Sequence, residues 1–171
     1  YLDENALTKV EQNIVIRNIK SSSYVSEFAL EIGSTNLNNL RVNLINGPDL
    51  PHSVIDSSSG TIISITIPNP VVGLDASLKF QVSYSQDDIS HLLGQVLEVN
   101  IPKHTPSRLG GSAITHLHIP KKFGNPVYLW PQSQFQENKA ESSIYTFVHS
   151  QDSTGMIRAV FGSKQFLQFT L

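Results

Sequence analysis

Apolar and polar residues alternate with a period of two through most of this chain, and this limits the fold more than any other feature. Successive side chains of a β-strand point to opposite faces, so the alternation gives each strand one buried and one solvated face. The clearest case is 78–84, where Lys79 and Gln81 separate the apolar residues. The predicted inward residues of this strand are Leu78, Phe80, Val82 and Tyr84. The chain is therefore predicted to be all-β.

About ten strands follow from this pattern, at 10–19, 24–32, 40–44, 63–67, 78–84, 96–101, 113–119, 144–150, 156–161 and 165–171. Residues that favour turns separate them, as in Asn46-Gly47-Pro48 and Ser153-Thr154-Gly155. Many short strands at such spacing are typical of an antiparallel β-sandwich.

Two segments allow more than one interpretation. The strand 10–19 carries apolar residues on both faces, with Val15 and Ile19 opposite the rest, so it is either covered on both sides or lies at an edge under a loop. The segment 87–94 is the only helical candidate, because Asp87 or Asp88 could cap a turn that Gly94 would end.

The segment 103–112 contains Pro106, Gly110 and Gly111 and has no apolar periodicity. It is the best candidate for a boundary between two lobes, 1–102 and 103–171. Because the second lobe is small for independent stability, two packed lobes are expected rather than two free domains.

Composition excludes several classes of protein. Charged residues form only 15% of the chain and the net charge is -2, which argues against a nucleic-acid partner. The absence of cysteine excludes disulfides and thiol nucleophiles. No stretch reaches the ~20 apolar residues that span a bilayer. We expect the chain to be part of a longer protein and to meet a membrane only through segments outside it.

His116 and His118 flank Leu117 in a predicted strand, so their imidazoles project from one face about 7 Å apart and could share a metal ion. The spacing of Gly110 and Gly124 around them is similar to that of cupins, but the expected carboxylate after the second histidine is absent. Since Leu117 supplies the buried face, the two histidines are expected on the solvent face, and no metal or other cofactor is expected.

Other candidate catalytic groups also have simpler interpretations. Ser112 lies in a Gly-Gly-Ser-Ala loop without the strand–turn–helix context of a nucleophile elbow. The acidic pairs Asp87-Asp88 and Asp3-Glu4 are interpreted as solvated or capping carboxylates. No catalytic residue is expected in this chain.

The aromatic segment 126–131 contains Tyr128 and the single tryptophan, Trp130, between two prolines. Exposed aromatic residues on a β-sandwich can stack on sugars, which makes Tyr128 and Trp130 a candidate carbohydrate site. The competing and favoured interpretation is that Trp130 fills the joint between the two lobes.

Three stretches, 40–56, 71–84 and 155–165, together resemble the β-rich region that precedes a transglutaminase-like, papain-type thiol domain in exported, membrane-anchored bacterial proteins. The hairpin that ends in Tyr84 equally resembles the N-terminal β domain of M1-type zinc aminopeptidases. Neither active site maps onto this chain, which lacks both the cysteine and the His-Glu-x-x-His motif.

These observations lead to the expectation of a non-catalytic accessory or interaction domain from a larger extracytoplasmic bacterial protein, which the resemblance places before a transglutaminase-like domain. Its expected partner is the rest of its own polypeptide or another protein. Two alternatives remain open: a carbohydrate-binding module that uses Tyr128 and Trp130, and a metal-dependent enzyme that uses His116 and His118.

Overall fold

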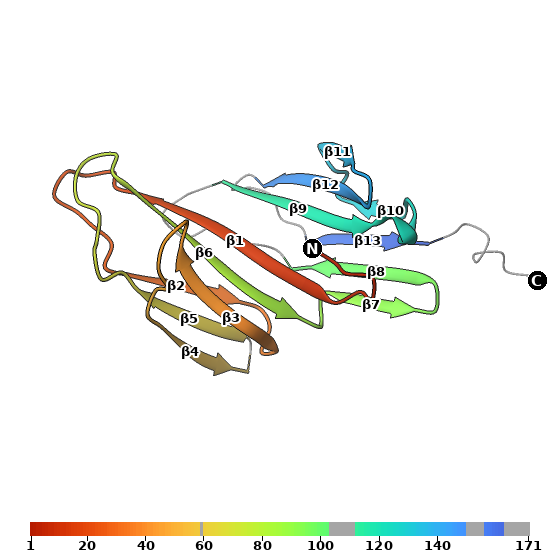
Figure 1. Cartoon of the computed structure of the whole chain (residues 1–171), viewed down its shortest axis with the longest axis horizontal. Helices are drawn as coiled ribbons and strands as arrows, with labels where there is room; N and C mark the ends of the chain where they lie inside the picture. The colour runs from red at the N-terminus through yellow and green to blue at the C-terminus, as the bar shows by residue number, and fades with distance from the viewer. Residues whose placement is uncertain (59, 103–111, 150–155, 163–171) are drawn as a thin grey trace, which may run out of the picture. The chain divides into compact units, whose positions relative to one another are not determined.

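The computed structural model describes residues 1–58, 60–102, 112–149 and 156–162. These residues form antiparallel sheets, so the chain is all-β, as the alternation predicts (Figure 1). The chain divides into two compact units. The first unit is Lys9–Gln86, and the second unit combines Tyr1–Thr8 with Asp87–Leu171. No helix in the described part of the chain is long and apolar enough to cross a membrane.

The first unit contains two three-stranded sheets. One sheet has the order β1 (Thr8–Arg17), β6 (Ser77–Gln86) and β3 (Leu37–Leu44). The other has the order β2 (Glu27–Ile32), β5 (Gly60–Thr66) and β4 (His52–Ser57). Between β3 and β4 the chain reverses at Asn46-Gly47-Pro48, where the amide of Leu44 donates to the carbonyl of Pro48 at 2.9 Å.

A single apolar core lies between these two sheets and makes the first unit a β-sandwich. Its buried residues are Leu30, Ile32, Val42, Leu50, Ile63, Ile65, Phe80, Val82 and Tyr84. The ring of Phe28 in β2 meets the ring of Phe80 in β6 edge-on, with centroids 5.6 Å apart. The predicted register of 78–84 is confirmed, because Phe80 and Val82 are fully buried while Lys79 is exposed and Gln81 is half-buried.

The structure decides between the two interpretations of the first strand. β1 lies at the edge of its sheet, and Val15 and Ile19 are 59% and 80% exposed. Coverage on both sides is therefore wrong, and so is the shielding loop, because Val15 is open to solvent and Ile19 lies beyond the end of β1. The inward residues of β1, among them Val10 and Ile14, pack against the core. The strand expected at 24–32 begins only at Glu27, so Tyr24 precedes β2 and is exposed.

The second unit also contains two sheets. One has the order β10 (Pro126–Trp130), β13 (Ile157–Phe161), β8 (Val96–Ile101) and β7 (Ser90–Leu93). The other has the order β11 (Phe135–Asn138), β12 (Ser142–His149) and β9 (Ala113–Pro120), and a short 3-10 turn, Lys121–Phe123, follows β9.

Both sheets of the second unit contribute fully buried side chains, and the rings of Tyr145 in β12 and Phe161 in β13 lie 5.7 Å apart. The N-terminal segment belongs to the same unit. The amide of Leu2 donates to the carbonyl of His118 at 3.1 Å, and the Ser90 hydroxyl donates to the carbonyl of Ala6. This segment therefore packs beside residues that follow it by more than 80 positions.

The helical turn expected over 87–94 is wrong: Ser90–Leu93 forms β7, which pairs with β8. Leu93 lies opposite Val96, so only Gly94 and Gln95 form the turn, and Gly94 has a φ of 65°. A two-residue hairpin turn favours glycine at such a position. Gly94, interpreted as the end of a helix, therefore belongs to a hairpin turn instead.

The two units differ in their bounds from the lobes 1–102 and 103–171. Val96–Ile101 pairs with both β7 and β13, so it lies inside the second unit rather than at the end of the first. The expected boundary segment 103–112, except Ser112, and the expected strand 165–171 lie outside the described residues.

Candidate functional site

Tyr128 and Trp130 lie two positions apart on β10 and share the outer face of the four-stranded sheet. They are 50% and 49% exposed. Leu129, between them, pairs with the fully buried Ala159 and faces the core. Side chains two residues apart on a strand are about 7 Å apart, so the two aromatic rings stand next to each other at the surface.

Polar side chains continue this face on the neighbouring strands. Trp130 lies directly opposite Arg158 of β13, and Arg158 lies opposite Asn100 of β8. The side-chain amide of Asn100 donates to Glu98 Oε1 at 3.0 Å. Directly opposed residues of an antiparallel pair share a face, so these side chains border the aromatic pair. We call Tyr128, Trp130, Arg158, Asn100 and Glu98 the aromatic platform.

The aromatic platform is suited to an extended ligand with apolar faces and polar edges. Its two rings offer flat apolar surfaces, and Arg158 and Asn100 offer hydrogen-bond donors beside them. The Arg158 guanidinium Nε lies 3.0 Å from Met156 Sδ, a weak acceptor. Arg158 forms no salt bridge with a carboxylate of the described residues. The arrangement can therefore bind hydroxyl groups while the rings stack.

Half of the Trp130 side chain is accessible, so Trp130 is not a core residue of its own unit, and its place at a joint between the lobes stays a prediction. The usual burial of a lone tryptophan in a core therefore does not hold within this unit. The strand register decides the question instead. Inward positions of β10 are set by Leu129, and this places both neighbouring aromatic residues on the outer face.

His116 and His118 lie on the outer face of β9, as predicted from the buried positions of Leu117 and Ile119. His116 Nδ1 lies 2.9 Å from the Thr146 hydroxyl of β12. The Tyr1 ring lies over the His118 imidazole, with centroids 4.1 Å apart and planes at 33°. Each imidazole is thus engaged by a neighbouring side chain on its own unit.

The electrostatics of His118 follow from this position. Burial lowers the pKa of His118 below its ordinary value of 6.5, and nearby positive charges, including His116 and Lys139, lower it further. Glu137 opposes the shift. His118 is therefore neutral over a wider pH range than an exposed histidine.

A metal site at His116 and His118 would need at least one further ligand from the fold. Among the described residues, no group of three or more histidine, aspartate or glutamate side chains could hold a metal ion. His104 lies outside the described part of the chain, and the His149 Nε2 atom lies 2.8 Å from the Thr115 hydroxyl. Within the described ranges, the structure therefore gathers no further ligands around His116 and His118.

The remaining polar candidates have local roles. Asp3 Oδ1 accepts hydrogen bonds from the amides of Asn5 and Leu7, both at 2.8 Å, which fits the expected capping role. Asp87 and Asp88 are exposed, as predicted. Ser112 precedes β9 and is exposed, and the glycines before it lie outside the described residues.

Comparison with known proteins gives no assignment. No protein-family profile matches the chain, and no curated protein is significantly similar to it. The site must therefore be judged on its geometry.

Sequence reasoning identified the two aromatic residues and missed the polar part of the platform. Arg158 and Asn100 come from strands 28 and 30 positions away from the tryptophan, and only pairing through β13 brings them together. The one available signal was their position, because each alternates with a residue that points into the core.

Proposed function

We propose that this chain is a non-catalytic binding module that holds a carbohydrate chain on its aromatic platform. The observation that carries the proposal is the pair of half-exposed rings, Tyr128 and Trp130, side by side on one strand with Arg158 opposite. Large aromatic side chains at such exposure leave apolar surface in contact with water. A ligand that covers them removes this surface from water, which is favourable for binding.

Carbohydrate fits the chemistry of this surface better than a purely apolar partner. A sugar ring has faces of C–H groups that stack on aromatic rings, and its edges carry hydroxyl groups. The guanidinium of Arg158 and the amide of Asn100 can donate to hydroxyl oxygens, while Glu98 can accept from hydroxyl hydrogens. Two rings about 7 Å apart would contact more than one sugar of a chain.

The module is proposed to serve a larger extracytoplasmic bacterial protein. The support is the similarity of 40–56, 71–84 and 155–165 to the β-rich region before transglutaminase-like domains. In that setting the platform would hold the attached domain close to a polysaccharide of a cell surface. The metal-dependent alternative receives less support, because the fold adds no third ligand to His116 and His118 within the described residues.

Affinity electrophoresis through gels that contain soluble neutral or acidic polysaccharides tests this function. We expect retardation by at least one polysaccharide, and Trp130→Ala should weaken it at least about tenfold, as for a residue that dominates an interface. The matched control is Phe135→Ala, which removes an exposed ring from β11 of the other sheet. Migration unaffected by every polysaccharide, or equal losses in both variants, would contradict the proposal.

A further inference from the structure

Two loops at one end of the first unit expose a cluster of apolar side chains. They are the segments 18–26, between β1 and β2, and 67–76, between β5 and β6. We call them together the loop tip. The exposed apolar residues of the tip are Ile19, Tyr24, Val71, Val72 and Leu74. Ile19 is 80% exposed, and Val72 and Leu74 are 62% and 61% exposed.

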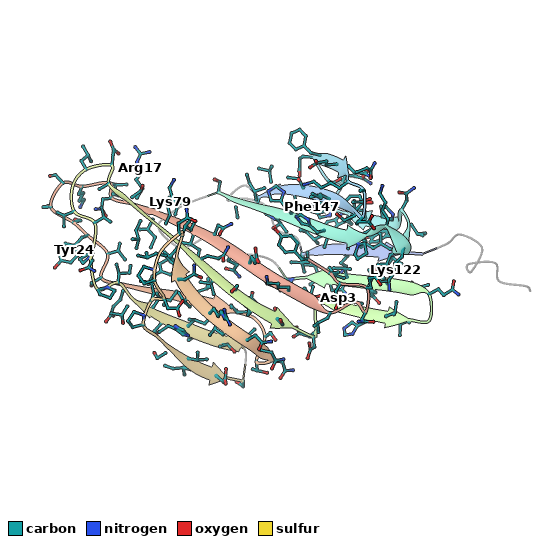
Figure 2. The ribbon with its side chains drawn as sticks, viewed as in Figure 1. Asp3, Arg17, Tyr24, Lys79, Lys122 and Phe147 are labelled. Carbon is teal, nitrogen blue, oxygen red and sulfur yellow. The ribbon has the colours of Figure 1, made fainter. Side chains whose placement is uncertain are left out.

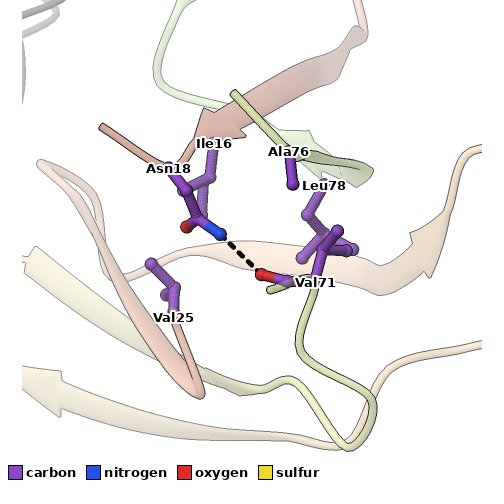
Figure 3. Close-up of a pocket in the computed structure, with 6 residues that line it drawn as sticks. All are labelled: Ile16, Asn18, Val25, Val71, Ala76 and Leu78. Atoms are coloured by element: carbon purple, nitrogen blue, oxygen red, sulfur yellow. Dashed lines mark hydrogen bonds between the residues drawn. The ribbon is translucent and has the colours of Figure 1, made fainter. Parts of the chain in front are cut away.

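The loop tip is held together by hydrogen bonds at its base. The amide of Asn18 donates to the carbonyl of Ala76, and the amide of Asp75 donates to the carbonyl of Asn18, both at 2.9 Å. The Asn18 side chain donates to the carbonyl of Val71 at 2.6 Å (Figure 3). The amide of Ile67 donates to the carbonyl of Ser26 at 2.8 Å. These bonds hold the two loops beside each other, so the exposed apolar residues are presented together at one end of the unit.

A hollow lies beneath these exposed residues, but it is too small to be a ligand pocket. It is lined by Ile16, Asn18, Val25, Val71, Ala76 and Leu78 (Figure 3). Its volume of about 10 Å³ holds no more than a water molecule. Any partner of the tip must therefore cover it from outside.

Charge in the loop tip is low, and its two charged residues have opposite signs. The two loops contain only Lys20 and Asp75 as charged residues. Arg17, at the end of β1, pairs with Asp75: its Nε lies 2.9 Å from Asp75 Oδ1. Figure 2 shows Arg17 and Tyr24 at this same end of the first unit. Because Asp75 pairs with Arg17, the loops contain no second acidic residue that could pair with Lys20.

The tip is also remote from the points where the chain enters and leaves the first unit. β1 begins at Thr8 and reaches the tip at Arg17, while β6 leaves the tip at Ser77 and ends at Gln86. Ten residues of extended strand span about 33 Å. The first unit therefore presents the loops at one end and both chain connections at the other (Figure 1).

We infer that the loop tip inserts into the surface of a lipid bilayer. Exposed apolar patches mark interaction sites, and apolar side chains at a membrane surface can enter the boundary between headgroups and acyl chains. Tyr24 is a residue type enriched at the membrane–water interface. Lys20 would face anionic headgroups. This inference differs from the expectation that only segments outside the chain meet a membrane, and it is independent of carbohydrate binding by the second unit.

Vesicle flotation tests the inference with the whole chain. We expect binding to phosphatidylcholine vesicles, because the attraction is mainly apolar. Adding phosphatidylglycerol should strengthen binding by no more than about fivefold, as for a single lysine. The double variant Val72→Asp with Leu74→Asp should bind at least about tenfold more weakly, and the control Ile55→Asp, which changes an equally exposed residue of β4, should bind as the wild type does.

A second measurement reads insertion directly and does not depend on an acidic variant. Because the chain has no cysteine, Leu74→Cys and Ile55→Cys each give a single labelling site for a polarity-sensitive dye. Vesicles should shift the emission of the dye at position 74 to the blue and leave the dye at position 55 unchanged. Failure to float with either vesicle type, equal binding by the double variant, or an unchanged dye at position 74 would overturn the inference.

Discussion

Tyr145→Phe is expected to stabilise the second unit. The Tyr145 side chain is fully buried, its ring packs near Phe161, and its hydroxyl has no hydrogen-bond partner among the described residues. A buried hydroxyl without a partner costs about 1–3 kcal/mol. The substitution keeps the ring and removes the hydroxyl, leaving only a small void, so we expect the free energy of unfolding to rise by about 1 kcal/mol.

Urea unfolding followed by tryptophan fluorescence measures this change, because the single tryptophan, Trp130, belongs to the same unit. Thermal unfolding should show a rise of about 4–8 °C for 1 kcal/mol in a unit of this size. Tyr128→Phe is the matched control, since it removes an exposed hydroxyl and should change stability by less than about 0.5 kcal/mol.

Alkaline pH gives an independent check on Tyr145. Burial raises the pKa of Tyr145 above its ordinary value of 10.0. The nearby Ser143 hydroxyl opposes part of that rise, but it donates to Asn138 Oδ1 at 2.9 Å and does not reach hydrogen-bond geometry with the Tyr145 hydroxyl. The unfolded chain therefore loses this proton at lower pH than the folded chain. Ionisation of Tyr145 leaves the free energy of unfolding unchanged below pH 10 and lowers it as the pH rises further. Tyr145→Phe should lack this part of the decline. A variant that is less stable by more than about 1 kcal/mol would refute the reasoning, because the hydroxyl would then have a partner.

Three further predictions concern packing, backbone and charge. Phe80→Ala should lower the stability of the first unit by about 3–5 kcal/mol in urea unfolding followed by circular dichroism, and a loss below about 1 kcal/mol would mean that Phe80 is not core. Gly60→Ala should lower the free energy of unfolding by more than about 1 kcal/mol in the same assay, because Gly60 has a φ of 153° and an added Cβ would lie 2.2 Å from the carbonyl oxygen of Ile32. An unchanged unfolding midpoint would show that the backbone at Gly60 moves to accommodate the Cβ. The lowered pKa of His118 contributes stability that is present above pH 6.5 and is lost as the pH falls below it. In urea unfolding measured on both sides of pH 6.5, His118→Gln should therefore lose less stability on acidification than the wild type. The same pH dependence in both proteins would contradict this prediction.

Local pattern was sufficient for the strands and their faces. Phe80, Val82 and Ile63 are buried where the alternation places them, since one buried face per strand is a local property of the sequence. The same logic placed His116 and His118 on the outer face of β9, because Leu117 occupies the inner one.

Long-range pairing was beyond local pattern. The segment 87–94 reads equally well as a helical turn or a hairpin strand, and its pairing with β8 decides for the strand. The unit boundary was misplaced for a similar reason: Val96–Ile101 gains its partner from β13, about 60 residues later. The polar half of the aromatic platform depends on that same pairing, so neither Arg158 nor Asn100 could be joined to Trp130 from the sequence.

The exposure of Trp130 is the property on which the proposed carbohydrate site depends most directly. Iodide quenching of its fluorescence, with and without a polysaccharide that retards the protein, measures both exposure and occupancy at a single residue. We predict red-shifted emission that iodide quenches readily in the free protein, followed by a blue shift and protection from iodide when the polysaccharide is bound. Blue-shifted emission that resists iodide in the free protein, or quenching that no polysaccharide reduces, would contradict the account.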